Sequence, residues 1–207
     1  MIELCDYLVQ LAVTVFAFCA ALVGYFRDRR QPWFLLACFY GTFALGTLYW
    51  TLHLLLRRET PQIFYVSDLA WVASFVFLLA LALTLPGEEE RRCRAGACWL
   101  VPAVCPPQFA LYVTHGDILF NVLMCGMTML LAWCALRGLV WAGRSGDGRL
   151  RPFHRAVLAF TVLEYALWTA SCFWVSDTLT NPYFWFDFLL TLVLLLFLPA
   201  VRKAVEA

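Results

Sequence analysis

The sequence predicts an all-α integral membrane protein with seven transmembrane helices. Of its 207 residues, 63% are hydrophobic and only 14% are charged, whereas soluble domains are roughly 45–50% apolar and about 25% charged. The apolar segments between clusters of Arg are about 20 residues long, which is the length that spans a bilayer. This composition excludes soluble enzymes, nucleic-acid-binding proteins and disordered tails, and it makes the lipid bilayer the first expected partner.

Seven hydrophobic stretches reach the length of a membrane span. Their apolar residues run continuously rather than alternating, which favours helices over the strands of a barrel. We therefore expect a single membrane domain, 1–207. The expected spans are 7–26, 33–56, 63–85, 95–113, 118–142, 153–176 and 182–201.

The first and fourth spans need separate justification. The first is followed by Arg27-Asp28-Arg29-Arg30 rather than by a small-residue cleavage site, so we expect a retained helix and not a signal peptide. The fourth is the shortest and carries Pro102, Pro106 and Pro107. Because proline removes backbone donors, this span is expected to be kinked or broken.

The distribution of basic residues predicts the orientation. Of the 15 Lys and Arg residues, only Arg57 and Arg58 lie on the side that holds the N-terminus. Basic connections stay in the cytoplasm. The N-terminus is therefore expected outside and the C-terminus inside, and we expect the chain in a bacterial cytoplasmic membrane.

Four short segments recur in the same order, which indicates an internal repeat. Three of the four pairs have nearly the same offset. An alternative is that aromatic-rich apolar helices resemble one another by chance. The pairs are Asp6-Tyr7-Leu8 with Asp117-Ile118-Leu119, Gln31-Pro32-Trp33-Phe34 with Arg151-Pro152-Phe153-His154, Leu48-Tyr49-Trp50-Thr51 with Ala166-Leu167-Trp168-Thr169, and Phe64-Tyr65-Val66-Ser67-Asp68 with Tyr183-Phe184-Trp185-Phe186-Asp187.

The repeat predicts two three-helix units, 1–86 and 116–207, joined by a linker helix within 87–115. Both units then enter the membrane in the same direction, so they are related by an axis along the membrane normal. This parallel 3-1-3 plan resembles SWEET-type sugar transporters, nicotinamide riboside transporters and microbial rhodopsins. A retinal Schiff base is excluded, because the only lysine, Lys203, lies beyond the end of the last span.

A closer resemblance is carried by Leu45-Gly46-Thr47-Leu48-Tyr49-Trp50 followed by Ser67-Asp68-Leu69-Ala70-Trp71, with a weaker copy around Trp168 and Asp187. This pattern is similar to the multi-helix membrane sensor modules of bacterial diguanylate cyclases and histidine kinases. The resemblance implies a sensor or receptor module that binds a small molecule. Since no cyclase or kinase follows in the sequence, we expect that signalling output is absent or lies in a partner, either a cytoplasmic signalling protein or a second copy in a homo-oligomer.

Carboxyl groups within the spans are the first candidates for a site, because ionised groups in a bilayer are costly. Glu164 lies near mid-depth, where the alternative is a structural hydrogen bond between helices. Asp68 and Asp187 lie a little over one turn inside their spans, and either binding or capping fits them. Asp6 and Asp117 mark the outer ends of spans, where capping of the helix N-terminus is the preferred interpretation.

Aromatic side chains are concentrated on the same outer side as these acids. An interfacial aromatic belt explains many of them without a ligand. The composition also suits an outward-facing pocket for a small amphipathic or cationic molecule. The expected ligand-binding residues are Asp68, Asp187, Glu164, Trp50, Trp168, Tyr65, Trp71, Tyr183, His53 and Asn121.

Signals for enzyme chemistry are weak. The nine cysteines form no Cys-x-x-Cys pair, the histidines lack metal-ligand spacing, and no nucleophile elbow is present. We expect no metal and no cofactor.

Two alternatives to a sensor stay open. One is a small-solute transporter with Glu164 and Asn121 near the middle of its cavity. The other is a membrane hydrolase resembling the lysoplasmalogenase family, although Gly46-Thr47 stands where that family has a Gly-Asp pair. Cavity shape separates them: closed towards the cytoplasm for a sensor, continuous for a transporter, and with carboxylates converging at headgroup depth for a hydrolase.

Overall fold

The computed structural model describes residues 2–59, 61, 65–116 and 118–206. The described residues are 86% helical and contain no strand. The repeat markers Phe64 and Asp117 lie outside the described residues. The helices are α1 (Ile2–Asp28), α2 (Gln31–Arg57), α3 (Tyr65–Thr84), α4 (Glu88–Arg92), η1 (Gly96–Trp99), α5 (Leu100–Val113), α6 (Ile118–Ser145), α7 (Arg151–Phe173) and α8 (Pro182–Glu206).

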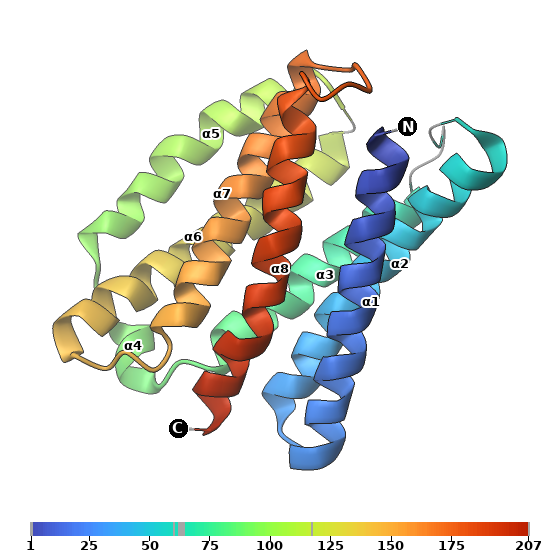
Figure 1. The fold of residues 1–207 in the computed structure, drawn as a ribbon. Helices are drawn as coiled ribbons and strands as arrows, with labels where there is room; N and C mark the ends of the chain where they lie inside the picture. The colour runs from blue at the N-terminus through green and yellow to red at the C-terminus, as the bar shows by residue number, and fades with distance from the viewer. Residues whose placement is uncertain (1, 60, 62–64, 117, 207) are drawn as a thin grey trace.

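Among the described residues, seven helical spans are long and apolar enough to cross a membrane, with η1 and α5 together forming the fourth. The predicted all-α membrane fold is therefore confirmed, and the chain is an integral membrane protein. Helix α5 continues through Pro106 and Pro107. Helix α1 begins and α8 ends at opposite ends of the bundle (Figure 1); these are called here the N-terminal end and the C-terminal end.

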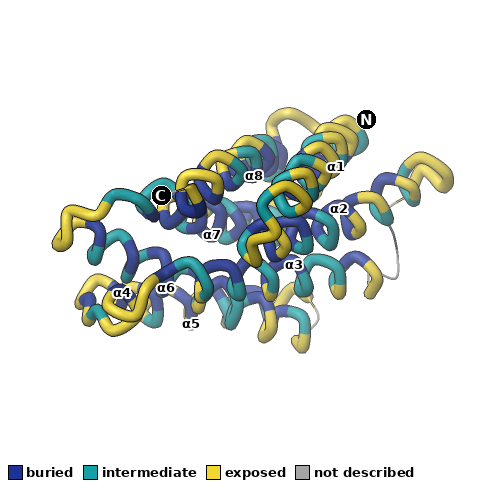
Figure 2. Tube along the Cα trace, turned by 90° about the horizontal axis from the view of Figure 1, so that it is seen from below, coloured by how far each residue is buried: buried dark blue, intermediate teal, exposed yellow. Residues whose placement is uncertain are grey.

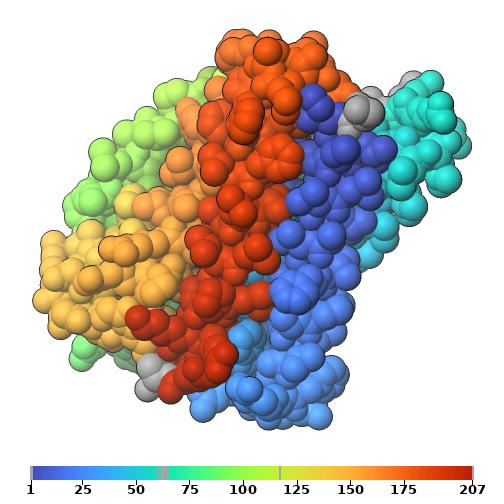
Figure 3. Space-filling view, in the orientation of Figure 1, coloured from blue at the N-terminus to red at the C-terminus, as the bar shows by residue number. Residues whose placement is uncertain are grey.

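Six of the helices form a closed ring. Helix α1 packs on α2, α2 on α3, α3 on α6, α6 on α7 and α7 on α8, and α8 returns to α1. Figure 3 shows α8 and α1 side by side on one face, and Figure 2 shows the buried stretches of chain towards the interior. Helix α5 lies outside this ring against α6 and α7 (Figure 1).

Two contacts join the predicted three-helix units, α1 with α8 and α3 with α6, and they are called here the seams of the ring. They bear on the repeat. The first helix of each three-helix unit contacts the third helix of the other, because α1 packs on α8 and α6 packs on α3. A two-fold axis along the membrane normal produces this exchange. The repeat itself stays a prediction.

A cluster of buried phenylalanines fills the ring towards its C-terminal end. Phe39, Phe153, Phe160 and Phe197 are 0% exposed and Phe75 is 1% exposed. The ring centroids of Phe75 and Phe160 lie 5.1 Å apart, and those of Phe39 and Phe197 lie 5.5 Å apart. Such tilted and edge-to-face pairs contribute about 0.5–1.5 kcal/mol each beyond area burial. These five residues, called here the phenylalanine cluster, leave little room for a passage through the ring.

Arginines at the C-terminal end bind the carbonyl groups of helix ends. Arg149 Nη1 donates to Ala204 O at 3.3 Å, and Arg151 Nη2 donates to Ala142 O at 2.9 Å. The last carbonyls of a helix lack intrahelical donors and carry partial negative charge. The basic residues that predict the orientation therefore also complete helix termini at that face.

With the C-terminus inside, a fluorescent protein fused to the C-terminus is expected to fluoresce, and alkaline phosphatase fused there is expected to be inactive. The reason is that basic connections are retained on the cytoplasmic side. Fluorescence of the first fusion and phosphatase activity of the second, both in intact cells, are the measurements. An active phosphatase with a dark fluorescent fusion would reverse the predicted orientation.

Helix α4 is anchored to the C-terminal end by a buried pair. His154 Nε2 lies 2.8 Å from Glu90 Oε1, and their side chains are 1% and 6% exposed. The imidazole fits because position 138 is glycine: a Cβ on Gly138 would lie 2.1 Å from His154 Nε2. Glycine at this position is therefore a packing requirement of the α6–α7 contact.

Replacing Gly138 with Ala is expected to lower the free energy of unfolding by about 1–3 kcal/mol, because the added methyl group overpacks the His154 ring. Thermal unfolding in detergent measures the change. Gly126→Ala in the same helix is the matched control, since a Cβ there meets no atom within 4 Å. Equal melting temperatures of the two variants would contradict the packing argument.

Candidate functional site

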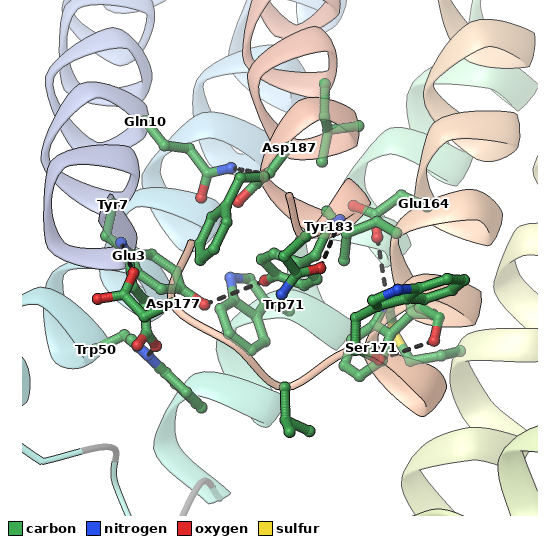
Figure 4. A pocket seen from close by; sticks show the side chains of 18 of the residues that line it. Glu3, Tyr7, Gln10, Trp50, Trp71, Glu164, Ser171, Asp177, Tyr183 and Asp187 are labelled. Carbon is green, nitrogen blue, oxygen red and sulfur yellow. Dashed lines mark hydrogen bonds between the residues drawn. The ribbon is translucent and has the colours of Figure 1, made fainter. Parts of the chain in front are cut away.

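A cavity of about 500 Å³ lies inside the ring at its N-terminal end (Figure 4). Known ligand pockets span about 300–1,000 Å³, so this cavity has the size of a small-molecule site. All six ring helices and the 174–181 loop contribute to its wall. Its carboxyl groups come from Glu3, Glu164, Asp177 and Asp187, and its indoles come from Trp50, Trp71, Trp168 and Trp174.

The floor of the cavity is apolar. Phe43, Phe75 and Leu190 line it, and Phe75 belongs to the phenylalanine cluster through its contact with Phe160. The described residues of the lining come from the N-terminal half of the ring. The cavity is therefore closed towards the C-terminal end in this structure.

Stacked aromatic rings build one wall. Tyr7 and Trp50 have ring centroids 5.7 Å apart at an interplanar angle of 29°, and the rings of Trp50 and Trp71 lie 5.9 Å apart. Trp71 reaches this place because position 46 is glycine: a Cβ on Gly46 would lie 2.8 Å from Trp71 Nε1. Three helices thus present π faces to the same space.

Glu164 lies on the opposite side of the cavity from Gln10 (Figure 4). Its side chain is 6% exposed, and Oε2 accepts a hydrogen bond from Trp168 Nε1 at 3.1 Å, one helical turn away. Among the described residues of the lining there is no Lys, Arg or His. The Glu164 carboxyl therefore faces a cavity that offers it no basic side chain.

Asp187 is held by an amide from another helix. Gln10 Nε2 on α1 donates to Asp187 Oδ1 at 2.6 Å, and Thr47 Oγ1 on α2 donates to Gln10 Oε1 at 3.2 Å. This chain joins α8, α1 and α2 across one seam of the ring. It fixes Gln10 with its carbonyl towards α2 and its amide nitrogen towards the carboxyl of Asp187.

The position of Asp6 corrects the sequence interpretation. Helix α1 begins at Ile2, earlier than the predicted position 7, so Asp6 lies inside the helix and not at its cap. Its side chain is 0% exposed and faces the carboxyl of Asp187. Neither carboxyl oxygen of Asp6 receives a hydrogen bond from a donor group of the described chain. Capping was therefore the wrong interpretation for this residue.

The 174–181 loop is fastened over the mouth of the cavity. Asp177 Oδ1 accepts a hydrogen bond from the Glu3 backbone N–H at 2.9 Å, which places a carboxylate at the start of α1. Asn181 Oδ1 accepts one from the Tyr183 N–H at 3.0 Å and caps α8. Trp50 Nε1 also donates to Glu3 Oε1 at 3.2 Å. Sequence reasoning missed Glu3, Asp177 and Asn181, because each contact depends on how distant segments meet.

Asn121 occupies a different place from the one expected for it. It lines a small gap between α5, α6 and α7, and its Nδ2 donates to Tyr112 O at 2.9 Å. The Tyr112 hydroxyl lies 3.0 Å from Thr169 Oγ1 and receives a hydrogen bond from Gln108 Nε2 at 3.2 Å. These contacts fasten α5 to the ring. Glu164 lines both this gap and the cavity.

The structure brings six of the predicted ligand-binding residues together. Tyr65 is 69% exposed, Asp68 is half-buried in the first turn of α3, and the ring of His53 packs near Tyr49. These three residues lie outside the lining, so their part in binding stays a prediction. The six in the lining are Asp187, Glu164, Trp50, Trp168, Trp71 and Tyr183.

Comparisons of the chain with protein families, curated protein sequences and solved structures found no match. The chemistry of the cavity is therefore the basis for function. It combines buried carboxyl groups, aromatic faces and hydrogen-bonding hydroxyl groups in one closed-ended space.

A double-mutant test addresses the aromatic wall. Gly46→Ala is expected to lower the free energy of unfolding by about 1–3 kcal/mol, because the methyl group overlaps the Trp71 indole. In the Trp71→Phe background the smaller ring relieves the overlap, so the cost of Gly46→Ala should fall. Thermal unfolding of the four proteins gives the coupling energy. Additive effects would exclude a direct contact between positions 46 and 71.

Proposed function

We propose that this chain is a receptor-like membrane module that binds a small ligand in the cavity at its N-terminal end. On binding, it signals through a partner or a second copy. The proposed location is a bacterial cytoplasmic membrane with the cavity open to the outside. The closed floor supports this proposal, since a ligand that enters has no continuous path through the phenylalanine cluster.

The ligand class follows from the lining. A carboxylate inside a membrane needs a compensating charge or proton, and the described lining supplies no basic side chain. Indole and phenol faces attract cations, by about 0.5–2 kcal/mol per contact depending on desolvation. A small organic cation with an apolar part therefore matches the cavity better than an anion or a sugar.

The observation that carries this proposal is the setting of Glu164. Its carboxyl is 6% exposed, receives a hydrogen bond from Trp168 and faces a cavity of ligand size. At the deep side of the cavity the carboxyl group supplies a counter-charge to a cation, and the surrounding indole rings supply π surfaces. An anionic ligand would be repelled by the same carboxyl group.

A membrane hydrolase is a second candidate, and the contact between Asp6 and Asp187 favours it. Two carboxyl groups that share a proton form an acid and a base in one site. Only Asp187 of the two lines the cavity, so the second carboxyl would act through the first. A small-solute transporter requires, in addition, an opening of the phenylalanine cluster.

The experiment uses phenyltrimethylammonium and its uncharged isostere tert-butylbenzene. The cation is expected to raise the melting temperature of the purified protein in nanodiscs, because it binds the folded state. The isostere should raise it far less. Glu164→Gln should weaken cation binding about tenfold or more, which corresponds to about 1.4 kcal/mol. Trp168 Nε1 still finds an acceptor in the amide.

Glu89→Gln is the matched control, because Glu89 is exposed on α4 at the other end of the bundle. Equal stabilisation by the isostere, or unchanged affinity in Glu164→Gln, would overturn the proposed ligand class. Accumulation of the cation in proteoliposomes would replace the sensor by a transporter. Release of fatty products from lipid by the purified protein would replace it by a hydrolase.

A further inference from the structure

Asp6 and Asp187 form a buried carboxyl pair next to the cavity. They are 0% and 2% exposed, and their carboxyl groups lie close enough to interact electrostatically. Asp187 also accepts a hydrogen bond from Gln10, whereas neither oxygen of Asp6 receives one from a donor group of the described chain. The carboxyl group that interacts with Asp6 is that of Asp187. Two ionised carboxyl groups repel each other in a buried site, so a proton on one of them stabilises the pair.

No basic residue among the described surroundings compensates this pair. The ionisable groups that face it are Glu3 and Tyr7 on α1, Tyr183 on α8 and, at greater distance, Glu164 on α7. Helix α2 contributes the hydroxyl of Thr47, through Gln10. Because like charges in a buried site do not both ionise, one proton stays on the pair.

Asp187 lines the cavity, whereas Asp6 is enclosed behind it. A cation that enters the cavity therefore meets one carboxyl of the pair. We propose that Asp6 and Asp187 are a proton site that releases its proton when the ligand cation binds, so that the protein exchanges a proton for an organic cation. This inference rests on the proposed function and adds the second ion.

The exchange balances in charge and atoms. The carboxyl O–H bond breaks, the proton passes through the mouth of the cavity to the outer solution, and the pair gains one negative charge. The bound cation supplies one positive charge beside Asp187. The interior of the bundle therefore has the same net charge before and after exchange, which avoids the cost of an extra ion in the membrane.

Calorimetric titration with phenyltrimethylammonium tests the exchange. This cation has no titratable proton, so any proton released comes from the protein. The heat of binding is measured in two buffers with different ionisation enthalpies. The wild-type protein is expected to release about one proton per bound cation at neutral pH, as linkage requires for competing ligands.

Asp6→Asn removes the proton but keeps a donor, since the amide N–H can bind the carboxylate of Asp187. This variant is expected to bind the cation with proton release near zero. Asp147→Asn is the matched control, because Asp147 is exposed in the loop between α6 and α7, and it should release protons like the wild type. Proton release that persists in Asp6→Asn would overturn the proposal.

The wild-type protein alone gives a second test. Because proton and cation compete, the cation affinity should rise with pH, approaching about tenfold per pH unit while the pair is protonated. An affinity independent of pH would overturn the exchange even if Asp6→Asn failed to fold. Cation binding without proton release would refute this inference and leave the proposed receptor intact. A complete lack of cation binding would refute the proposed function as well.

Discussion

In a bilayer, a polar group that finds no partner within the protein costs several kcal/mol, because lipid chains offer no hydrogen bonds. The ring of helices meets this constraint at one seam by joining inward-facing polar side chains to one another. Asp187 depends on Gln10, and Gln10 depends on Thr47, so three helices share one polar chain. The cavity lies between these hydrogen-bonded side chains and the aromatic wall, where the side chains do not fill the ring.

Helix contacts in this fold cannot depend on the hydrophobic effect, because lipid chains are as apolar as leucine. Close packing replaces it, and glycines opposite rings make that packing tight. Trp33 packs on Gly24, where a Cβ would lie 2.8 Å from the indole, and His154 packs on Gly138 in the other three-helix unit. In each unit the ring stands at the start of the second helix. Close packing of a ring on a glycine therefore occurs twice at the C-terminal end, whereas the cavity lies at the N-terminal end.

Much of the fold followed from the sequence, because apolar length alone defines a membrane span. Glu164 and Asp187 were found for the same reason, since a carboxyl in an apolar run is conspicuous. Asp6 and Gln10 were missed: α1 begins earlier than its apolar run, and Gln10 meets Asp187 across 177 positions. Asn121 was assigned to the main cavity although it fastens α5. Periodicity places a residue on a helix, but helix contacts decide which neighbour it meets.

The depth of the cavity is set by a change in aromatic chemistry along the ring. Near the mouth, Trp and Tyr side chains bind Glu3 and each other through their polar atoms. The phenylalanine cluster that begins at Phe75 offers no hydrogen bond, and Tyr40 beside it already donates its hydroxyl to Leu194 O. A charged ligand gains from carboxyl groups and indoles only as far as Glu164, and beyond that level it would lose both. In the proposed receptor, a bound ligand would stop at the closed floor, and its binding free energy would act on the helices around it. The seam between α1 and α8, held by Gln10 and Asp187, is where a ligand-induced movement of the helices would begin.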